Sequence, residues 1–467
     1  MTRHFFASIT RNTTSLVGTG LVVGSLTLIV TLFVVQSLGL RGGAYLGIVT
    51  FLILPMFLLA GLILIPVGIS RDRKRIAAAG EEALGARFPV LDLNEEHTRK
   101  SLTLTLAFAT LSIVVLASAT YKGVDVMDST AFCGTVCHTV MQPEFIAHQR
   151  SPHARVACAD CHIGPGADWF IKSKLSGAWQ VIAVALDLYP TPIPTPIHDL
   201  RPARETCEQC HWPTTYVGDL LKVKTVYTDD EVNTPLKTAV LLKVGGLAGR
   251  QTSGIHWHVN PDITIRYRSD ETRETIYDVE LTTEDGEVKV YKTADTPEDA
   301  MPWRVMDCVD CHNRPTHRYR LPMDEVDNAM ANGYIDNTLP YIKRESMRLL
   351  KNGYQTHAEA RESIARDLTE FYETNYPDVI ESRMDAVDKA AAELVVIYTS
   401  NVFPEMKVDW GTYPDHSEHM DSPGCWRCHD RKHRTEDRER ISRDCDLCHT
   451  ILAQEEENPE ILETLNP

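Results

Sequence analysis

All twelve cysteines of this 467-residue chain occur in six pairs, and a histidine follows the second cysteine of every pair. Five pairs have the strict spacing Cys-x-x-Cys-His, whereas the first pair has three residues between its cysteines. The cysteines are Cys133 and Cys137, Cys158 and Cys161, Cys207 and Cys210, Cys308 and Cys311, Cys425 and Cys428, and Cys445 and Cys448, followed by His138, His162, His211, His312, His429 and His449. No cysteine is left over.

This pattern is the attachment signature of c-type haem. Two thioethers hold the porphyrin while the next imidazole reaches the iron, so the chemistry fixes the spacing. Structural zinc usually takes four ligands from paired motifs, a thioredoxin-like pair does not require the trailing histidine, and a disulfide scaffold does not force adjacent spacing. The sequence therefore predicts six haem c groups, with a lone disulfide as the alternative for the first pair.

Three apolar stretches lie near the N-terminus, at residues 16–38, 44–69 and 102–121. Each is long enough to cross a bilayer core of about 30 Å. The first is longer than the apolar region of a signal peptide and is not followed by a small-residue cleavage site. We therefore predict that residues 1–121 are a membrane anchor with three transmembrane helices. Gly20-x-x-x-Gly24 can provide a helix-packing face in the first of them.

Basic residues near the ends of membrane spans remain in the cytoplasm. Arg3 and Arg11 precede the first span, seven Lys and Arg residues lie in the 70–101 loop, and only Arg41 separates the first two spans. Three spans then deliver everything after Tyr121 to the outside, where haem c is attached. The sequence predicts a multi-pass protein of the bacterial cytoplasmic membrane with a periplasmic haem domain.

The exported part is acidic, since residues after 120 hold 37 Lys and Arg against 58 Asp and Glu. Nucleic-acid binding requires clustered positive charge, so we expect no nucleic-acid partner. Membrane lipid, quinol and exported redox proteins or other membrane-complex subunits are the expected partners.

A low-spin haem needs a sixth ligand, usually His or Met. Ten histidines of the exported part lie outside the motifs. The six near motifs or in apolar surroundings are the predicted distal ligands: His153, His256, His258, His317, His419 and His433. The other four are interpreted as surface or core histidines: His148, His198, His357 and His416. The three spans contain no histidine, so they offer no bis-histidine b-type haem site.

Residues 102–212 and 305–320 resemble the NapC/NirT family of membrane-anchored multihaem cytochromes, which draw electrons from quinol and pass them to outer partners. The resemblance rests on the membrane helix before the first motif, Ser151-Pro152-His153 ahead of the second, and His317 after the fourth. It implies a four-haem core. It also implies that Met141, three residues after His138, is an axial ligand, although the family pattern places this Met one residue closer.

The family's quinol pocket uses a lysine and a carboxylate about two turns apart on a helix after the second motif. By resemblance, Lys172 or Lys174 would contact menaquinol or ubiquinol, and Gln180 stands about where the acid belongs. Glutamine cannot accept the proton that quinol loses. The base is then Asp168, Asp187, a haem propionate or absent. The alternative is an interfacial helix whose lysines and tryptophans contact lipid headgroups.

The expected fold is a multihaem cytochrome c, mostly α and loop, with a haem-packed core and a β-rich insert. We assign residues 122–219 and 300–323 to the core and 220–299 to the insert, where alternating sequence predicts strands and Glu284–Glu287 predicts a hairpin turn. A strand of this insert is expected to present His256 or His258. Residues 324–400 have helical spacing, and 401–467 hold the last two motifs.

The first functional hypothesis is transfer of electrons from membrane quinol to an exported acceptor, with the last two haems at the exit. The second is an electron-wire subunit of a larger respiratory or photosynthetic membrane complex, without its own quinol site. The third is reduction of a small substrate at a haem with an open sixth position.

Overall fold

The computed structural model divides the chain into two compact units. The first consists of Met1–Cys133 and Ala157–Ala178, and the second of Gly134–Val156 and Trp179–Pro467. The second motif therefore groups with the N-terminal unit instead of with the other core motifs. The structure describes residues 13–37, 53–79, 93–96, 99, 103, 121–122, 126, 129–135, 138–164, 167–197, 200–212, 218–245, 254–294, 296–298 and 300–465.

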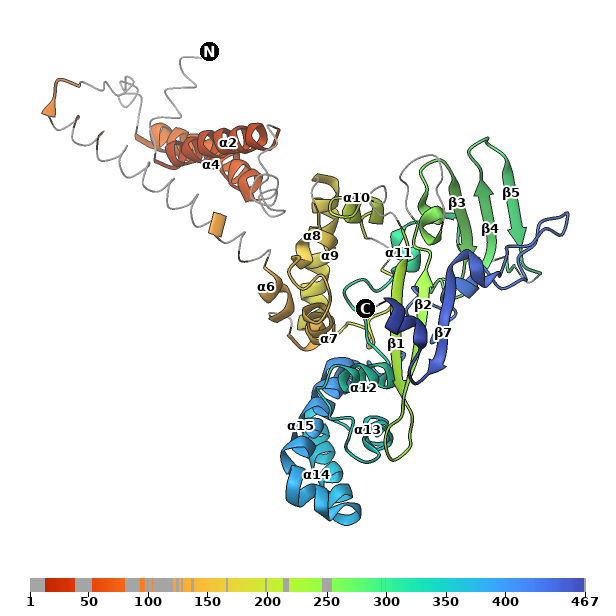
Figure 1. The fold of residues 1–467 in the computed structure, drawn as a ribbon. Helices are drawn as coiled ribbons and strands as arrows, with labels where there is room; N and C mark the ends of the chain where they lie inside the picture. The colour runs from red at the N-terminus through yellow and green to blue at the C-terminus, as the bar shows by residue number, and fades with distance from the viewer. Residues whose placement is uncertain are drawn as a thin grey trace. The chain divides into compact units, whose positions relative to one another are not determined.

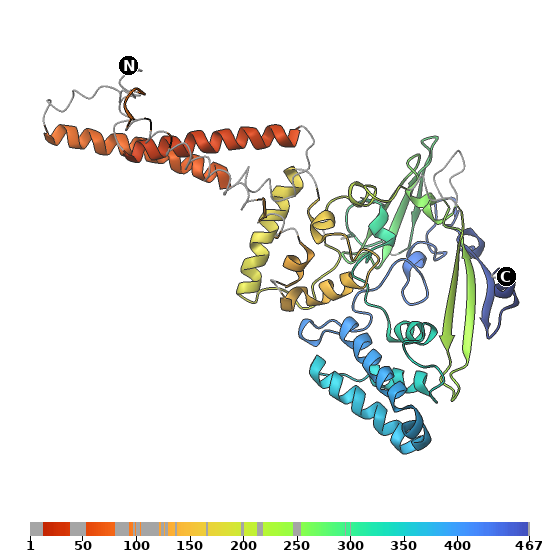
Figure 2. The ribbon, with the colours of Figure 1, turned by 60° about the vertical axis from the view of Figure 1, so that its left-hand side comes forward.

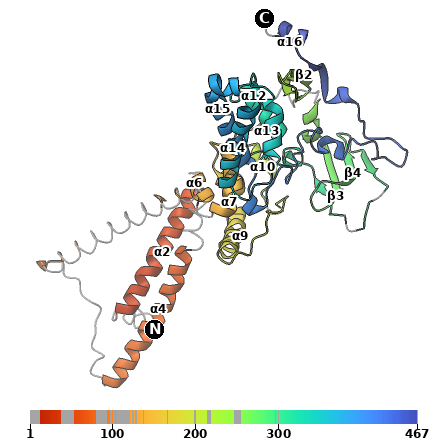
Figure 3. The same ribbon diagram turned by 90° about the horizontal axis from the view of Figure 1, so that it is seen from below.

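Two long helices, α2 (Thr13–Ser37) and α4 (Leu54–Ala79), pack side by side in the first unit (Figures 1 and 3). A Cβ atom on Gly61 would lie 2.6 Å from the carbonyl oxygen of Gly18, so the close backbone approach requires glycine. Ser15 Oγ also donates to the carbonyl oxygen of Ile65 at 3.0 Å. Small residues of this kind are typical of helix interfaces in membranes.

The predicted packing face at Gly20 and Gly24 is not used in this contact. A Cβ atom on either glycine would meet no heavy atom of the described residues within 4 Å. Because an α-helix has 3.6 residues per turn, Gly18 presents a different side of α2 from Gly20. The contact between α2 and α4 therefore uses Gly18, and packing at Gly20 and Gly24 stays a prediction.

Among the described residues, Leu54–Asp72 is the one segment long and apolar enough to cross a membrane. Thr13–Ile29 and Leu175–Ala185 are shorter apolar stretches. Helix α4 continues to Ala79, past the predicted end of the second span at residue 69. The predicted third span, 102–121, lies almost entirely outside the described residues.

Short helices carry or flank the first four motifs. They are α6 (Thr130–Thr135), α7 (His138–Gln149), α8 (Cys158–His162), α10 (Ala203–Cys207) and α11 (Cys308–Cys311), and α9 (Ala167–Ala185) follows the second motif. The last two motifs begin on the 3₁₀ turns η6 (Gly424–Arg427) and η7 (Cys445–Leu447). Residues three and four apart lie on one side of a helical turn, so one turn brings both cysteines and the histidine together.

A three-stranded antiparallel sheet has the order β1-β2-β7, as Figure 2 shows from the side. Its strands are β1 (Leu220–Tyr227), β2 (Pro235–Leu242) and β7 (His449–Glu456). Strand β7 starts at the histidine of the last motif and pairs its first residue with Leu242. The chain's last motif is therefore attached to a sheet formed more than 200 residues earlier in the sequence.

A second, four-stranded sheet has the order β5-β4-β3-β6. Its strands are β3 (Thr264–Ser269), β4 (Ile276–Thr282), β5 (Val288–Lys292) and β6 (Arg304–Val305). Strands β4 and β5 pair across the predicted turn, where Gly286 has φ of +80°. Ile265, Tyr267, Ile276, Val279 and Tyr291 form its small buried core. The β-rich insert is thus split between two sheets.

The segment Ile255–Val259 is a 3₁₀ helix, η4, so the prediction that a strand presents its histidines is wrong. Gly254, with φ of +78°, turns the chain immediately before it. A Cβ atom there would lie 2.3 Å from the carbonyl oxygen of Lys243, so only glycine fits. This turn ends the alternating strand pattern.

The helical segment contains α12 (Pro322–Ala331), α13 (Ile342–Leu350), α14 (His357–Asn375) and α15 (Pro377–Asn401). Thr356 caps α14 by accepting a hydrogen bond from the Glu359 backbone N–H at 3.1 Å. Ile364, Leu368 and Tyr372 recur every four residues and are fully buried. They belong to the largest buried apolar cluster among the described residues, which also contains Leu394 and Ile397 of α15. The turn η5 (Pro404–Met406) and the C-terminal helix α16 (Glu460–Leu465) follow.

Leu368→Ala should lower the free energy of unfolding of this segment by about 2–5 kcal/mol, because it leaves a cavity in a closed apolar core. The exposed Glu373 on the same helix provides the control, and Glu373→Ala should change this free energy by about 0.5 kcal/mol or less. Urea unfolding followed by far-UV circular dichroism measures both. Equal midpoints for the two variants would contradict the assigned core.

Candidate haem sites

Two axial imidazoles bind an iron from opposite sides, which sets the separation of their rings. With metal–nitrogen bonds of about 2.0–2.1 Å and about 1.1 Å more to each ring centre, the centroids should lie about 6.3 Å apart. In addition, a ligating histidine usually donates a hydrogen bond from its other ring nitrogen, which fixes the tautomer. These two requirements test whether the histidines fit haem iron.

The pair His258 and His429 meets both requirements. Their ring centroids are 5.8 Å apart. Nδ1 of His258 lies 2.8 Å from the carbonyl oxygen of Ile255, and Nδ1 of His429 lies 2.6 Å from that of Ser442. Burial lowers the pKa of His258, which favours the neutral, ligating imidazole. Both rings are thus prepared to use Nε2 as the ligand atom.

Two further motif histidines face a predicted distal ligand at the same spacing. His153 and His211 have centroids 5.9 Å apart, and His419 and His449 have centroids 6.0 Å apart. Nδ1 of His153, His419 and His449 is buried and has no hydrogen-bond partner among the described residues. The spacing fits two ligands of one iron, whereas the second requirement is not met at Nδ1 of these three histidines.

His256 interacts with the motif histidine of the fourth pair. Partial burial lowers the pKa of His256, and nearby His312 lowers it further. In a 3₁₀ helix, with three residues per turn, His256 and His258 point about 120° apart, whereas in a strand they would share a face. The η4 turn thereby directs one histidine to the fourth motif and the other to the fifth.

His317 and His433 each contact a carboxylate through Nδ1. The distances are 2.9 Å from His317 to Glu144 Oε2 and 3.0 Å from His433 to Asp430 Oδ1. Burial opposes the charge on Glu144, but the His317 hydrogen bond and Arg314 hold its pKa below the ordinary value. His433 is fully buried, and its Nε2 has no partner among the described residues. A carboxylate that orients a histidine is typical of metal ligands.

The histidines interpreted as structural use Nε2 for ordinary contacts. In His148, Nε2 lies 3.0 Å from the carbonyl oxygen of Val156. In His357 it lies 2.6 Å from the carbonyl oxygen of Val402, and in His416 it lies 3.1 Å from Glu274 Oε1. His148 has its ring 6.5 Å from that of His317, but its Nε2 is already engaged. His198 lies outside the described residues.

The last four motifs lie near one another in sequence order. A hydrogen bond from the Cys207 thiol lowers the pKa of Cys308 and joins the third motif to the fourth. Burial raises the pKa of Cys311 to about 12, and nearby Cys425 of the fifth motif contributes to the rise. Cys425 likewise contributes to the raised pKa of Cys448 in the sixth, behind burial.

The aromatic residue of the fifth motif couples it to the sixth. Trp426 stacks on His419, with ring centres 4.5 Å apart and planes inclined by 12°. The same histidine faces His449. Arg443 covers Trp426, with its guanidinium carbon 4.1 Å from the ring centre. One stack of side chains therefore joins two successive motifs.

Residues inside the motifs hold their backbones in place. Asp310 accepts hydrogen bonds from Tyr267 of β3 at 2.6 Å and from Arg304 Nε at 3.0 Å. Arg427 donates to the carbonyl oxygens of Arg273 at 2.8 Å and Asp310 at 2.5 Å. These supports were not predicted from the sequence, although Asp310 and Arg427 each directly precede the second cysteine of a motif.

The residues of the predicted quinol site lie on or beside α9. Lys172 is exposed, and its Nζ lies 4.4 Å from the ring centre of Trp169. Gln180 and Asp187 are exposed as well, and Asp187 follows the end of the helix. The side chains of Asp168 and Lys174 lie outside the described part of the chain. Lysine over tryptophan at a helix surface agrees with either a quinol contact or a lipid-headgroup contact.

The first motif is described only in part. Cys137 and the side chain of His138 lie outside the described residues. Met141 is half-buried on α7. Its predicted role as an axial ligand is therefore not tested.

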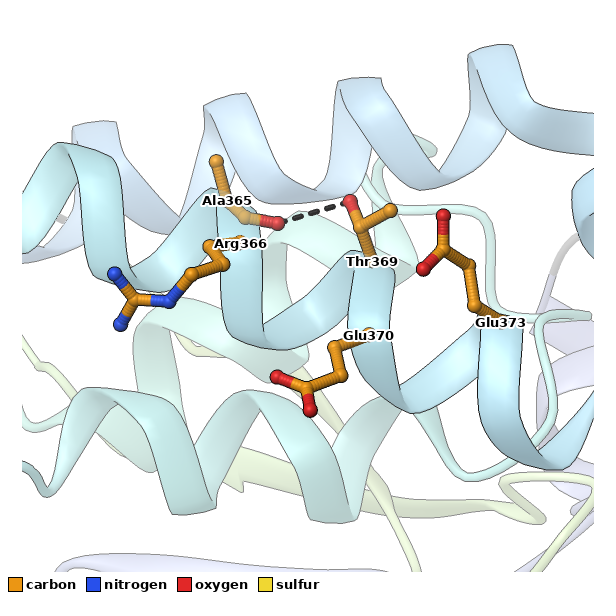
Figure 4. A pocket seen from close by; sticks show the side chains of 5 residues that line it. All are labelled: Ala365, Arg366, Thr369, Glu370 and Glu373. Atoms are coloured by element: carbon orange, nitrogen blue, oxygen red, sulfur yellow. Dashed lines mark hydrogen bonds between the residues drawn. The ribbon is translucent and has the colours of Figure 1, made fainter.

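A hollow of about 550 Å³ on α14 is unrelated to these motifs (Figure 4). Five residues of that single helix line it, from Ala365 to Glu373, and the one interaction drawn is the hydrogen bond from Thr369 to the Ala365 carbonyl oxygen. It contains no histidine or cysteine. It has none of the converging polar groups of a binding site.

Comparison with known proteins identifies the family that this chain resembles. The N-terminal region of the NapC/NirT cytochrome c family matches residues 95–192. The chain is 40% identical over 464 residues to the cytochrome c-type protein ImcH of Geobacter sulfurreducens, which covers 98% of this chain and 91% of that protein. It is 32% identical over 147 residues to the cytochrome c nitrite reductase subunit NrfH of Nitratidesulfovibrio vulgaris. The match covers 29% of this chain and 87% of that protein. No solved structure matches.

Tyr267→Phe should lower the free energy of unfolding by about 1–3 kcal/mol, because buried Asp310 loses one charge-assisted hydrogen bond. Tyr277→Phe on the neighbouring strand is the control, since no hydrogen bond of its hydroxyl is found among the described residues. Chemical denaturation of the mature protein measures both changes. An equal loss in the two variants would show that the Asp310 contact does not stabilise the fold.

Proposed function

Because the chain belongs to the NapC/NirT family of membrane-anchored multihaem c-type cytochromes, we propose that it carries six haem c groups and transfers electrons from membrane quinol to an exported redox partner. The observation that carries the proposal is the set of motif histidines facing non-motif histidines at the spacing of two axial ligands. The bound haem supplies the one-electron redox chemistry. The chain supplies the ligands, their orientation and the order of the sites.

The contacts favour four specific ligand pairs. His211 pairs with His153, His312 with His256, His429 with His258, and His449 with His419. His317, His433 and Met141 remain as further proposed ligands, and a carboxylate orients each of the two histidines.

The anchor is proposed to cross the membrane three times, with the haem-carrying part in the periplasm. Leu54–Asp72 supports a span, and Arg71, Arg73, Lys74 and Arg75 at its end favour a cytoplasmic position for that end. Pairing of α2 with α4 through Gly18 and Gly61 supports two adjacent spans. The third span is proposed from the sequence alone.

Quinol oxidation is proposed at α9, where Lys172 binds a quinol oxygen and an acidic group accepts the proton. Exposed Leu175, Trp179, Val181 and Ile182 on the same helix support a location at the lipid surface, where quinol is found. The proton acceptor is proposed to be Asp168 or Asp187, because Gln180 cannot accept a proton.

A second candidate function is an electron-wire subunit of a larger complex. Gln180 in place of an acid favours it, as does similarity to NrfH, whose name makes it a subunit of a nitrite reductase. In this case another chain oxidises quinol, and this chain only transfers the electrons. Small-substrate reduction at an open haem is disfavoured, because four motif histidines each have a facing or interacting histidine.

Menaquinol should reduce the haems of the detergent-purified chain, and Lys172→Gln should slow this reduction about tenfold or more while reduction by dithionite remains complete. Lys389→Gln, at an exposed lysine of α15, should have no effect. Stopped-flow absorbance in the haem bands measures the rates. If quinol fails to reduce the wild-type chain while dithionite succeeds, the wire-subunit function replaces the first proposal.

His258→Gly should convert one of six haems to the high-spin form, because it removes the ligand opposite His429. His357→Gln should leave every haem low-spin, because Nε2 of His357 contacts only a carbonyl oxygen. Electron paramagnetic resonance, together with the haem-to-protein ratio, distinguishes the two. An unchanged low-spin spectrum in the His258 variant would disprove this ligand pair.

A further inference from the structure

A cavity of about 200 Å³ lies beside the motif histidine His312. Four arginines of one unit line it: Arg150 directly follows α7, whereas Arg314, Arg318 and Arg320 lie in the segment between the fourth motif and α12. Two carboxylates, those of Glu325 and Asp415, also line it. The lining charges therefore favour an anion.

All four arginines lie near a protein carboxylate, but three of them are also open to solvent. Arg150 Nη2 lies 2.8 Å and Arg320 Nε lies 3.7 Å from Glu325. Arg318 pairs with Asp415 and lies 3.4 Å from Glu418. These three side chains are also 37–46% exposed, so water can solvate them.

Arg314 differs from the other three in its burial. Its side chain is only 9% exposed, and its nearest carboxylate oxygen, Glu144 Oε1, is 3.7 Å from Nη2, too far for a hydrogen bond. Nε and Nη2 are buried without a hydrogen-bond partner among the described residues. The guanidinium lies over the ring of Tyr413, 4.1 Å from its centre, so its plane is held in place.

Buried charged donors without acceptors are costly, and the guanidinium fork matches a carboxylate. The Glu144 carboxylate lies 2.9 Å from His317 through Oε2 and 3.7 Å from Arg314 through Oε1, so it forms no hydrogen bond with the guanidinium. Arg314 follows the iron ligand His312 by two residues, so a haem bound at Cys308 and Cys311 would bring its own carboxylates to the same cavity. A haem propionate is the carboxylate most directly available there.

We propose that Arg314 binds a propionate of the haem attached at Cys308 and Cys311, with Tyr413 fixing the plane of the guanidinium. This inference rests on the proposed function, since it requires that haem. The positive charge of Arg314 favours the reduced, less positive haem and raises its reduction potential. Arg314 is thereby a cofactor-binding residue and also sets the potential of the fourth site.

Arg314→Gln should lower the potential of one of six haems by about 59 mV, which corresponds to a tenfold shift in its one-electron equilibrium. Arg314→Lys keeps the charge but loses the fork, so it should restore part of this shift. Arg320→Gln, in the same cavity but paired with Glu325, should cause no resolved shift. Spectroelectrochemical titration of the full-length holoprotein measures the potentials, and the haem-to-protein ratio shows whether each variant is fully loaded.

Unchanged potentials in fully loaded Arg314→Gln would overturn the propionate contact. The cavity could instead take a free anion, in which case added inorganic phosphate would shift the same potential in the wild type but not in Arg314→Gln, and the proposal would be wrong. A wild-type protein that lacks haem on the Cys308–Cys311 peptide by mass spectrometry would refute the proposed function itself, so the two failures are distinguishable.

Discussion

The roles of the histidines in this protein depend on which ring nitrogen of each imidazole already contacts another protein group. Nδ1 is held by a carbonyl oxygen in His258 and His429 and by a carboxylate in His317 and His433. In His148, His357 and His416, Nε2 takes the protein contact instead. The protein contact is thus at Nδ1 in the first group and at Nε2 in the second. His153 and His419 belong to neither group, because their buried Nδ1 has no hydrogen-bond partner among the described residues.

Local features of this fold could be predicted because each depends on neighbouring residues. The motif turns follow from spacing within five residues, and the β4–β5 hairpin follows from the glycine at its turn. The α14 helix follows from apolar residues every four positions and a threonine cap. In each case the residues that decide the structure lie within one turn or one hairpin.

Other features could not be predicted because they depend on residues far apart. Gly254 forces a turn only because Lys243 passes close to it, so alternation alone suggested a strand. Glu144 orients His317 although the two residues are 173 positions apart, so no local sequence pattern predicts that contact. Likewise, Gly18 packs against Gly61 although the spaced pair Gly20 and Gly24 matches the better-known motif. Asp430 is an intermediate case, since its position three residues before His433 is visible in the sequence.

The described motifs also differ from the helical segment in what holds them together. The helical segment encloses many fully buried apolar side chains, whereas Cys210, His211 and Trp212 around the third motif are exposed. A haem placed between His153 and His211 would cover such surface and add apolar contact that the chain lacks there. Contacts between successive motifs would then place neighbouring haems close together, since Cys207 touches Cys308 and Trp426 stacks on His419. The last four motifs are therefore neighbours in the order in which they follow one another along the chain.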